Sequence, residues 1–480
     1  MQVKKETKKI IQYLRDISDI PRASGDETAI CEYLLKFATD RGLECWKDEK
    51  GNFYAKVPAC GECSDEPVIL QGHMDMVYVR TDDCPHAYEE GIEVLEDEDY
   101  LYANGTSLGA DNGIAVAYCM ALMDSNDVEH PELEIILTVE EEIGLVGAKY
   151  ADISRFRGKK FINLDAEEEG VFTVSCAGGY RASMYWDVEK ALVDGTYAEI
   201  QVVLTGLKGG HSGVFIDSGR ANAIQLAGRL LHYMNNNYDY YIGDISTKGG
   251  KENILCKDAK MTFYVKPSDA EAVLRGLKAF ISVFENEYGN TDTLEMKVEM
   301  TDEKSDVLAF PKELKERLTS AILLIPHGVM DFSHKIEGLV ETSMNMGAIE
   351  YVDGRVHLLS SVRSSVSTKK AFIKDKLQII GAHYCDEIQF LNDYPEWEYK
   401  EDSKLRDVAC EAYHTVFGRE AKVQAIHAGL ECGYFYGKDN ELDIISMGPD
   451  VYDIHTVNEK ISKKSIGRTW AFIKEILHNL

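Results

Sequence analysis

The sequence predicts an α/β protein with a mixed sheet that is covered by helices on both faces and interrupted by an inserted α+β domain. Short apolar strands alternate with amphipathic helices over residues 1–187, a pattern typical of a sheet covered on both faces. Over residues 188–391 the pattern changes to helices and paired strands, and over residues 392–480 the first pattern returns. We therefore expect one domain made of the first and last segments, with the middle segment inserted as a second domain.

The elements of the first segment follow from hydrophobic periodicity and from residues that start or stop helices. Two amphipathic helices flank a turn at Pro21–Gly25, and Gly42 lies just beyond the second helix. Apolar runs of strand length and one of helix length come next. The expected elements are helices Thr7–Ile17 and Glu27–Thr39, strands Asn52–Val57 and Val68–Leu70, helix Ile114–Met123, and strands Glu134–Val139 and Lys160–Asp165.

The middle segment holds two successive groups of strands and helices, and the last segment returns to the first pattern. The first group comprises strand Glu199–Leu204, helix Ala221–Met234, strand Lys260–Val265, helix Ala270–Phe284 and strand Leu294–Met300. The second comprises helix Pro311–Leu324, strands Glu341–Ile349 and Arg355–Val362, and helix Lys369–Ile380. The last segment contributes helix Lys404–Phe417, strand Lys422–Ile426 and helix Lys463–Leu480.

Composition excludes several classes of function. The chain has 82 acidic against 52 basic residues, a net charge of -30, which argues against non-specific binding to nucleic acid or to an anionic membrane. No apolar run approaches the roughly 20 residues of a membrane helix. The basic N-terminus has no apolar segment behind it, and the 11 scattered cysteines indicate reduced thiols. We expect a cytoplasmic protein, a monomer or a homodimer, with no nucleic-acid or membrane partner.

Residues able to bind metal or move protons follow the predicted strands, where ligand sites collect in α/β sheets. His73 and Asp75 lie two residues apart and point to the same side of an extended chain, which suits a metal-bound histidine held by an acid. Taken alone, a structural histidine bonded to an acid is the simpler interpretation. Asp111 lies between glycines at a helix start and, taken alone, is best interpreted as an N-cap. The glycines would also let the backbone approach an ion closely.

Further acids and a second histidine complete the set. Glu140–Glu142 and Asp165 follow neighbouring strands, and such a charge run is normally a solvated loop. If these acids share one site, they would repel each other unless a cation neutralises them. With His73 and the late His455 they form a mixed nitrogen and oxygen ligand set, which suits zinc, manganese or cobalt better than calcium or magnesium. Three of the carboxylates and one hydroxide would neutralise two divalent ions.

Several motifs of the chain carry a family resemblance. Gln71–Asp75, Gly109–Gly113, Thr138–Gly144 and Asn163–Asp165 resemble, in the same order, the motifs of the co-catalytic dinuclear zinc peptidases. That superfamily includes carnosinases, aminoacylases, tripeptidase and glutamate carboxypeptidases. Two more segments, Gly209–Gly213 and Ile426–Gly433, resemble its aminoacyl-histidine dipeptidase branch, also called cytosol non-specific dipeptidase or Xaa-His dipeptidase. The resemblance covers nearly the whole chain.

The resemblance implies a metallopeptidase catalytic domain with two divalent metal ions, zinc by expectation and manganese or cobalt as alternatives. His73 and Asp165 would bind one ion, Glu142 and His455 would bind the other, and Asp111 would bridge them.

The resemblance also implies the acid and base chemistry. Asp75 would hold His73 in its ligating tautomer, and Glu141 would be the general base, although its place between two other glutamates leaves that assignment open by one residue. A hydroxide between the metals would attack the peptide carbonyl, and Glu141 would pass the proton to the leaving amine. The family often has Asp where this chain has Glu140, and we expect no consequence because that residue is neither ligand nor base.

The inserted domain would act as a lid that contributes substrate contacts. Arg363 matches an arginine near the substrate carboxylate in the resembling dipeptidases, with a surface salt bridge as the alternative. His211 stands on a glycine-flanked turn and would donate to the developing oxyanion, with a packed structural histidine as the alternative. Asn253 and Gly429 would assist substrate binding.

The expected activity is therefore hydrolysis of unblocked dipeptides, including carnosine-like Xaa-His substrates, by a metal-dependent dipeptidase. The metal motifs alone do not separate this activity from that of an aminoacylase or a carboxypeptidase-like amidohydrolase, but Ile426–Gly433 favours the dipeptidase branch. A catalytically inactive scaffold is disfavoured, because every expected ligand and the expected base are present.

Overall fold

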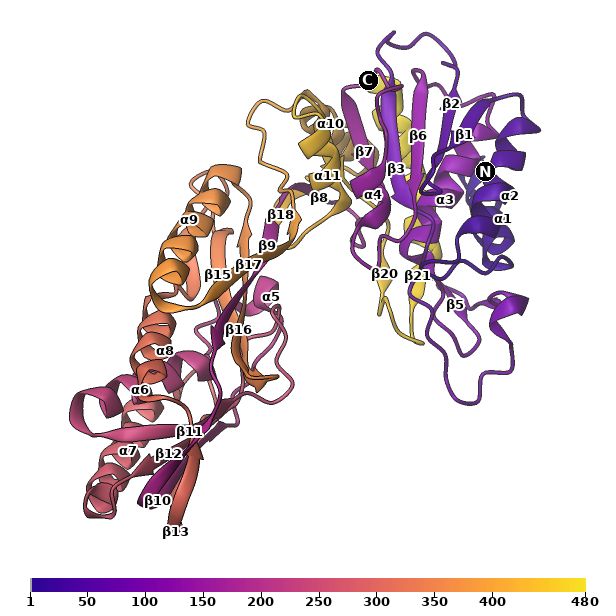
Figure 1. The fold of residues 1–480 in the computed structure, drawn as a ribbon. Helices are drawn as coiled ribbons and strands as arrows, with labels where there is room; N and C mark the ends of the chain where they lie inside the picture. The colour runs from indigo at the N-terminus through magenta and orange to yellow at the C-terminus, as the bar shows by residue number, and fades with distance from the viewer. Residues whose placement is uncertain (1) are drawn as a thin grey trace. The chain divides into compact units, whose positions relative to one another are not determined.

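The computed structural model describes residues 2–480, and its residue contacts divide the chain into two units (Figure 1). Unit 1 contains the described residues up to Cys176 together with Tyr399–Ile426 and Leu430–Leu480. Unit 2 contains Ala177–Glu398 and the three-residue segment His427–Gly429. Along the chain, unit 2 begins after Cys176 and its long segment ends at Glu398, whereas the sequence predicted limits of 187 and 391. Strands β9 (Gly178–Asp187) and β17 (Glu387–Tyr394) pair with each other within unit 2.

Unit 1 is built on a mixed eight-stranded sheet. In spatial order its strands are β1 (Glu44–Lys47), β2 (Phe53–Val57), β6 (Leu133–Thr138), β3 (Val68–His73), β7 (Lys160–Asn163), β19 (Asp443–Ser446), β8 (Val171–Cys176) and β18 (Lys422–Ile426). Strands β6, β3, β7 and β19 run parallel to one another. Every residue of β3, β6 and β8 is buried, so both faces of this sheet are covered.

The helices of unit 1 are α1 (Gln2–Ser18), α2 (Thr28–Thr39), α3 (Ala110–Met123), α4 (Val146–Tyr150), α10 (Lys404–Phe417), α11 (Glu431–Lys438) and α12 (Lys463–Asn479), with a 3-10 turn at Tyr88–Glu90. Helix α3 is apolar on nearly all sides, and it packs on β3 beneath α1. Helix α12 packs against α1 and α10, and its Phe472 ring stacks on Phe172 of β8 with centroids 5.2 Å apart.

A second, four-stranded sheet in unit 1 carries the late part of the chain. Its strands are β20 (Val451–Tyr452), β21 (Lys460–Ser462), β5 (Tyr100–Ala103) and β4 (Val94–Glu96). Strands β20 and β21 pair antiparallel, so the loop between them projects from one end of this sheet. That loop contains His455 and Glu459.

Unit 2 contains two antiparallel sheets that share one hydrophobic core. The four-stranded sheet has the order β11 (Tyr240–Ser246), β12 (Ala259–Val265), β10 (Ala191–Thr205) and β13 (Glu295–Ala309), and the five-stranded sheet has the order β14 (Gly328–Phe332), β15 (Val340–Val352), β16 (Arg355–Ser364), β9 and β17. Helices α6 (Ala223–Asn237), α7 (Pro267–Tyr288), α8 (Lys312–Leu324) and α9 (Ser367–Tyr384) pack on them, and a short helix α5 spans Ser212–Phe215. The two sequence groups of the middle segment lie in these two sheets.

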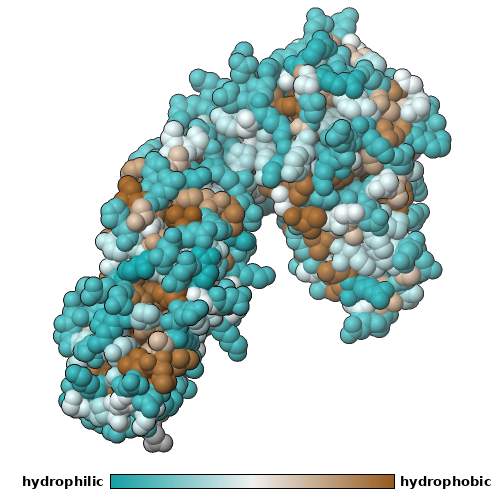
Figure 2. All heavy atoms as spheres, viewed as in Figure 1, coloured by the Kyte–Doolittle hydropathy of each residue, from teal (hydrophilic) through white to brown (hydrophobic). Residues whose placement is uncertain are grey.

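Figure 2 shows a mostly hydrophilic surface with apolar patches over the helices of unit 2, where Leu324, Phe372 and Ile379 are exposed. Within residues 2–480, no helix is both long and apolar enough to cross a membrane. None of the 11 cysteines is in a disulfide.

Gly448 should be needed for steric reasons. A Cβ atom at this position would lie 1.8 Å from the carbonyl oxygen of Ala166, the residue that directly follows Asp165. We expect Gly448→Ala to lower the free energy of unfolding by about 1–3 kcal/mol, because the backbone must move to relieve the overlap. Gly418→Asn is the control. Gly418 follows α10 in the left-handed backbone conformation, which Asn tolerates, and a Cβ atom there would meet nothing within 4 Å, so stability should change by only a few tenths of a kcal/mol. Equal losses in urea unfolding would contradict this account.

Candidate active site

The candidate site lies in unit 1, at the end of the sheet where parallel strands β3, β6 and β7 finish. In the ladder, His73 of β3 is opposite Thr138 of β6, and Gln71 of β3 is opposite Asn163 of β7. Because the carboxyl ends of parallel strands meet at one edge, the segments that follow them carry their side chains to the same place. Glu141 and Glu142 follow β6 in this way, and Asp165 follows β7.

His73 lies at the centre of one half of the cluster and is almost completely buried. Its Nε2 atom is 3.2 Å from Asp111 Oδ1, 3.4 Å from Asp165 Oδ1 and 4.0 Å from Glu141 Oε2. The buried Asp165 Oδ1 has no hydrogen-bond partner. A buried carboxylate oxygen without a donor is costly unless a cation satisfies it.

Asp111 joins the two halves of the cluster. Its Oδ2 atom is 3.2 Å from Nε2 of His455, and the same His455 nitrogen is 2.9 Å from Glu142 Oε1. Asp111 is not the N-cap of α3: Gly109 holds that position, and the backbone of Asp111 is non-helical, with φ -82° and ψ 105°. The two oxygens instead face two imidazoles.

The three consecutive glutamates point to three different places. Glu140 forms an ion pair with Lys50, with Oε2 and Nζ 2.8 Å apart, and therefore points away from the cluster. Glu141 faces His73, and Glu142 faces His455. Of these three glutamates, Glu141 and Glu142 face the cluster, while their roles as base and ligand stay predictions.

Asp75 contacts His73 twice and also holds the glutamate loop. His73 Nδ1 is 3.1 Å from the Asp75 carbonyl oxygen and 3.3 Å from its carboxylate Oδ1. The carboxylate accepts the N–H groups of Glu141 and Glu142 at 3.0 and 3.2 Å, and the hydroxyl of Ser24 donates to it at 2.8 Å. Burial raises the pKa of Asp75, but the hydrogen bond and charge of His73, with the hydrogen bonds of Glu141 and Ser24, lower it overall.

Two buried charged residues that sequence reasoning missed support the Asp111 loop. The Glu459 carboxylate accepts the N–H groups of Leu108 and Gly109, both at 2.9 Å, and that of Asp111 at 3.2 Å. The guanidinium of Arg22 donates to the carbonyls of Met74 and Gly109. No local motif marks either residue: Glu459 is 348 positions from Asp111 in the chain.

A second polar group lies beneath the strand ends; its residues belong to the motifs quoted above, but sequence reasoning gave them no role. The buried carboxylate of Glu431, at the start of α11, accepts hydrogen bonds from Gln71 Nε2 and from the Thr138 hydroxyl. Gln71 Oε1 in turn accepts from Asn163 Nδ2 at 2.6 Å. Burial raises the pKa of Glu431 to about 8. This network links β3, β6 and β7 directly below the cluster.

The electrostatics of the cluster favour a bound cation. Burial raises the pKa of Asp165 to about 6 and that of Glu141 well above its usual value, and neighbouring carboxylates add to both shifts. The hydrogen bonds of Asp111 and Glu142 raise the pKa of His455 to about 10. Ligand atoms of His73, Asp111 and Glu142 lie within 4.8 Å of one another. This donor set, with the unpartnered oxygen of Asp165, fits divalent metal ions of the zinc type.

The four substrate contacts expected from the resemblance all belong to unit 2. His211 precedes α5, and the carbonyl of Asn253 accepts the N–H of Ser212 at 2.8 Å. Arg363 is on β16 and Gly429 is in the segment His427–Gly429. Burial lowers the pKa of His211, and the charge of Arg363 lowers it further, so this imidazole is neutral at pH 7.

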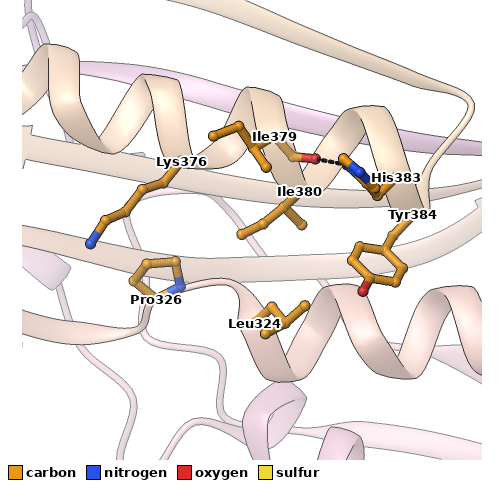
Figure 3. A pocket seen from close by; sticks show the side chains of 7 residues that line it. All are labelled: Leu324, Pro326, Lys376, Ile379, Ile380, His383 and Tyr384. Carbon is orange, nitrogen blue, oxygen red and sulfur yellow. Dashed lines mark hydrogen bonds between the residues drawn. The ribbon is translucent and has the colours of Figure 1, made fainter.

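Unit 2 also has a groove of about 550 Å³ that is lined mainly by apolar side chains (Figure 3). It lies between the end of α8 and helix α9, with Ile379, Ile380 and Leu324 on its walls. The residues that line the groove include no Asp or Glu, and the Nδ1 atom of His383 is 2.8 Å from the carbonyl oxygen of Ile379. The groove therefore holds no acid–base pair or ligand set.

A cluster of carboxylates and imidazoles at strand ends is a donor set of the kind that metal-dependent hydrolases use. Comparison with known proteins agrees: the profile of Peptidase family M20/M25/M40 matches residues 69–479, and the chain belongs to this family. It is 30% identical over 468 residues to the cytosol non-specific dipeptidase of Escherichia coli (strain K12), covering 97% of this chain and 96% of that protein.

Solved structures show the same fold. The aminoacylhistidine dipeptidase from Vibrio alginolyticus superposes with a TM-score of 0.92 at 30% identity, over 98% of this chain and 96% of that one. The aminopeptidase PepT from Bacillus cereus shares the fold at a TM-score of 0.56 and 17% identity, over 98% of both chains. The predicted metallopeptidase fold is thereby confirmed.

Metal loading should release protons, because the imidazoles of the metal-free site are protonated at neutral pH. The pKa of His455 is raised to about 10, so at pH 7.5 its ring carries a proton that a metal ligand must lose. We expect fully loaded His455→Asn to release about one proton fewer per chain than the fully loaded wild type, measured with a pH indicator. His478→Asn, on the surface of α12, is the control. Identical release from wild type and His455→Asn would mean that His455 gives up no proton to the metal.

Proposed function

We propose that the chain is a metal-dependent dipeptidase that hydrolyses unblocked dipeptides, including Xaa-His substrates of the carnosine type. The observation that carries the proposal is the convergence of His73, Asp111, Glu142, Asp165 and His455 beside Glu141 at the strand ends of unit 1. Family membership and two dipeptidase relatives that match nearly the whole chain support it and favour it over an aminoacylase.

We propose two divalent ions, with zinc the best match to the donor set and manganese or cobalt as alternatives. His73 and Asp165 would hold one ion, Glu142 and His455 the other, and Asp111 would bridge them through its two oxygens. When bound, such ions polarise the scissile carbonyl and lower the pKa of water.

The remaining chemistry belongs to the chain's own side chains. Glu141 would take a proton from the attacking water and pass it to the leaving amine, and its raised pKa suits this exchange near neutral pH. Asp75 would keep Glu141 in place through the hydrogen bond to its backbone N–H, and would keep His73 oriented toward the metal. His211, as a neutral N–H donor, would stabilise the oxyanion, assisted by Asn253.

The partner is a small peptide, and we propose a cytoplasmic location without nucleic-acid or membrane partners. The acidic net charge and the absence of disulfides among the 11 cysteines support this location. Whether the enzyme works as a monomer or a homodimer is decided by its mass in solution.

Substrate selectivity tests the proposal directly. With two equivalents of zinc, manganese or cobalt, the enzyme should hydrolyse Ala-His and carnosine, and chelation should abolish the activity. N-acetyl amino acids should be cleaved at least about 100-fold more slowly, since a site that binds a charged amine rejects an analogue without it. Faster cleavage of N-acetyl amino acids than of dipeptides would replace the dipeptidase by an aminoacylase.

His211→Ala should affect the transition state more than substrate binding. Loss of one oxyanion donor usually costs about 10²–10³-fold in kcat, so we expect that drop with a much smaller change in KM. The variant should keep its metal content and its circular dichroism spectrum. His232→Ala, an exposed histidine on helix α6 of the same unit, is the matched control. An unchanged kcat in His211→Ala would remove unit 2 from the chemical step.

A further inference from the structure

In the five-stranded sheet of unit 2, three polar residues and one glycine lie directly opposite one another across four strands. Ser343 of β15 is opposite Arg363 of β16, Arg363 is opposite Gly179 of β9, and Gly179 is opposite Tyr394 of β17. Directly opposite residues of antiparallel strands share one face of a sheet and lie about 5 Å apart. The four positions therefore form one continuous row, with Arg363 near its middle.

Tyr394 reaches Arg363 across the gap that Gly179 leaves. The Arg363 Nη1 atom donates to the Tyr394 hydroxyl at 3.0 Å. A Cβ atom on Gly179 would lie 2.7 Å from this hydroxyl and 2.5 Å from the carbonyl of Val362. A side chain at position 179 would therefore occupy the space through which the hydrogen bond passes.

A β-bulge aims Tyr394 at this row. Between Leu391 and Tyr394 the register shifts by one residue, so Tyr394 lies opposite Gly179 where regular pairing would place Asp393. Lys370 of α9 holds the bulge by donating to the Asp393 carboxylate at 3.0 Å and to the Tyr394 carbonyl at 2.9 Å. Bulges next to functional sites commonly re-aim a side chain in this way.

The segment His427–Gly429 lies over the same row. A Cβ atom on Gly429 would be 2.8 Å from the Tyr394 ring, so the glycine permits the close approach. His427, only 7% exposed, bonds to Ser343 at the other end of the row, with Nε2 and Oγ 2.7 Å apart. Burial lowers the pKa of His427 to about 3, and the positive charge of Arg363 contributes to this lowering.

One edge of the Arg363 guanidinium is left for a ligand. Its Nη1 atom is engaged by Tyr394, but its Nε–H is buried and has no acceptor. A buried cationic donor without an acceptor is costly, and a carboxylate that binds side-on would satisfy it with two parallel hydrogen bonds. The charge of Arg363 acts on the nearby imidazoles of His211 and His427 and lowers the pKa of both, and neither ring can supply a negative charge to pair with it.

We propose that Tyr394 is a positioning residue that fixes the guanidinium of Arg363 so that its Nε edge binds the C-terminal carboxylate of the dipeptide. The inference rests on the proposed dipeptidase function, because it assigns the carboxylate of that substrate to this row. Tyr394 thereby sets selectivity for free over amidated C-termini, and Gly179 and Gly429 are required because they make room for it.

The test compares Ala-His with its C-terminal amide in the metal-loaded enzyme. Wild type should prefer the free acid, mainly through KM. Tyr394→Phe keeps the ring but removes the hydroxyl, and we expect it to raise KM for the acid about tenfold, to leave KM for the amide unchanged and to change kcat less than threefold. Arg363→Ala should abolish the preference for the acid, and adding Tyr394→Phe to it should cost nothing further.

Tyr185→Phe is the matched control, because Tyr185 lies on β9 of the same sheet and its ring stacks on His357 instead. An unchanged acid-to-amide ratio in Tyr394→Phe, or an equal loss on both substrates, would overturn the inference while leaving the dipeptidase function intact. If wild type hydrolyses no dipeptide, the proposed function fails. The inference is then decided by whether acetate protects Arg363 from phenylglyoxal in wild type but not in Tyr394→Phe, as measured by mass spectrometry.

Discussion

The buried carboxylate of Asp75 is the contact on which the candidate site depends. It accepts the N–H groups of Glu141 and Glu142 after β6, while the ring of His73 at the end of β3 lies against the same residue. Two segments from different strands thus take their positions from a single residue. Without that carboxylate, the proposed base and one proposed ligand would lose their common anchor. The proposed metal ligands would then lie farther apart, and the site would bind a metal ion more weakly.

Both units contain a buried polar atom that has no hydrogen-bond partner within the protein. In unit 1, five carboxylates lie within 4.0 Å of two imidazoles, and the buried Oδ1 atom of Asp165 has no hydrogen-bond partner. In unit 2, the buried Nε–H of Arg363 has no acceptor, although the Nη1 atom of the same guanidinium donates to the Tyr394 hydroxyl. We therefore propose that each unit contains a charged site completed by a ligand of the opposite charge: metal cations in unit 1 and the substrate carboxylate in unit 2.

The sequence predicted the secondary-structure elements and site residues that local patterns mark. Buried strands such as β3 and β6 are short apolar runs, and the residues that follow them are marked by glycines and acids, so their convergence was predictable from sheet geometry. Partners distant in the chain were not predictable. Arg22 and Glu459 are far from the Asp111 loop in the chain, and only the folded structure brings them into contact with it. The bulge through which β17 pairs with β9 has no local sequence pattern that would predict it. The helix-cap interpretation of Asp111 was wrong because its carboxylate serves two imidazoles rather than the helix.

The central claim is that Glu141 moves protons while Glu142 binds metal, although they are adjacent in the chain. Elemental analysis of the two single variants, each reloaded with zinc and freed of excess metal, tests that division most directly. Glu141→Gln should keep about two ions per chain and lose about 10²–10⁴-fold in activity, whereas Glu142→Gln should lose metal. Equal metal loss in both variants, or full metal content in Glu142→Gln, would contradict the account.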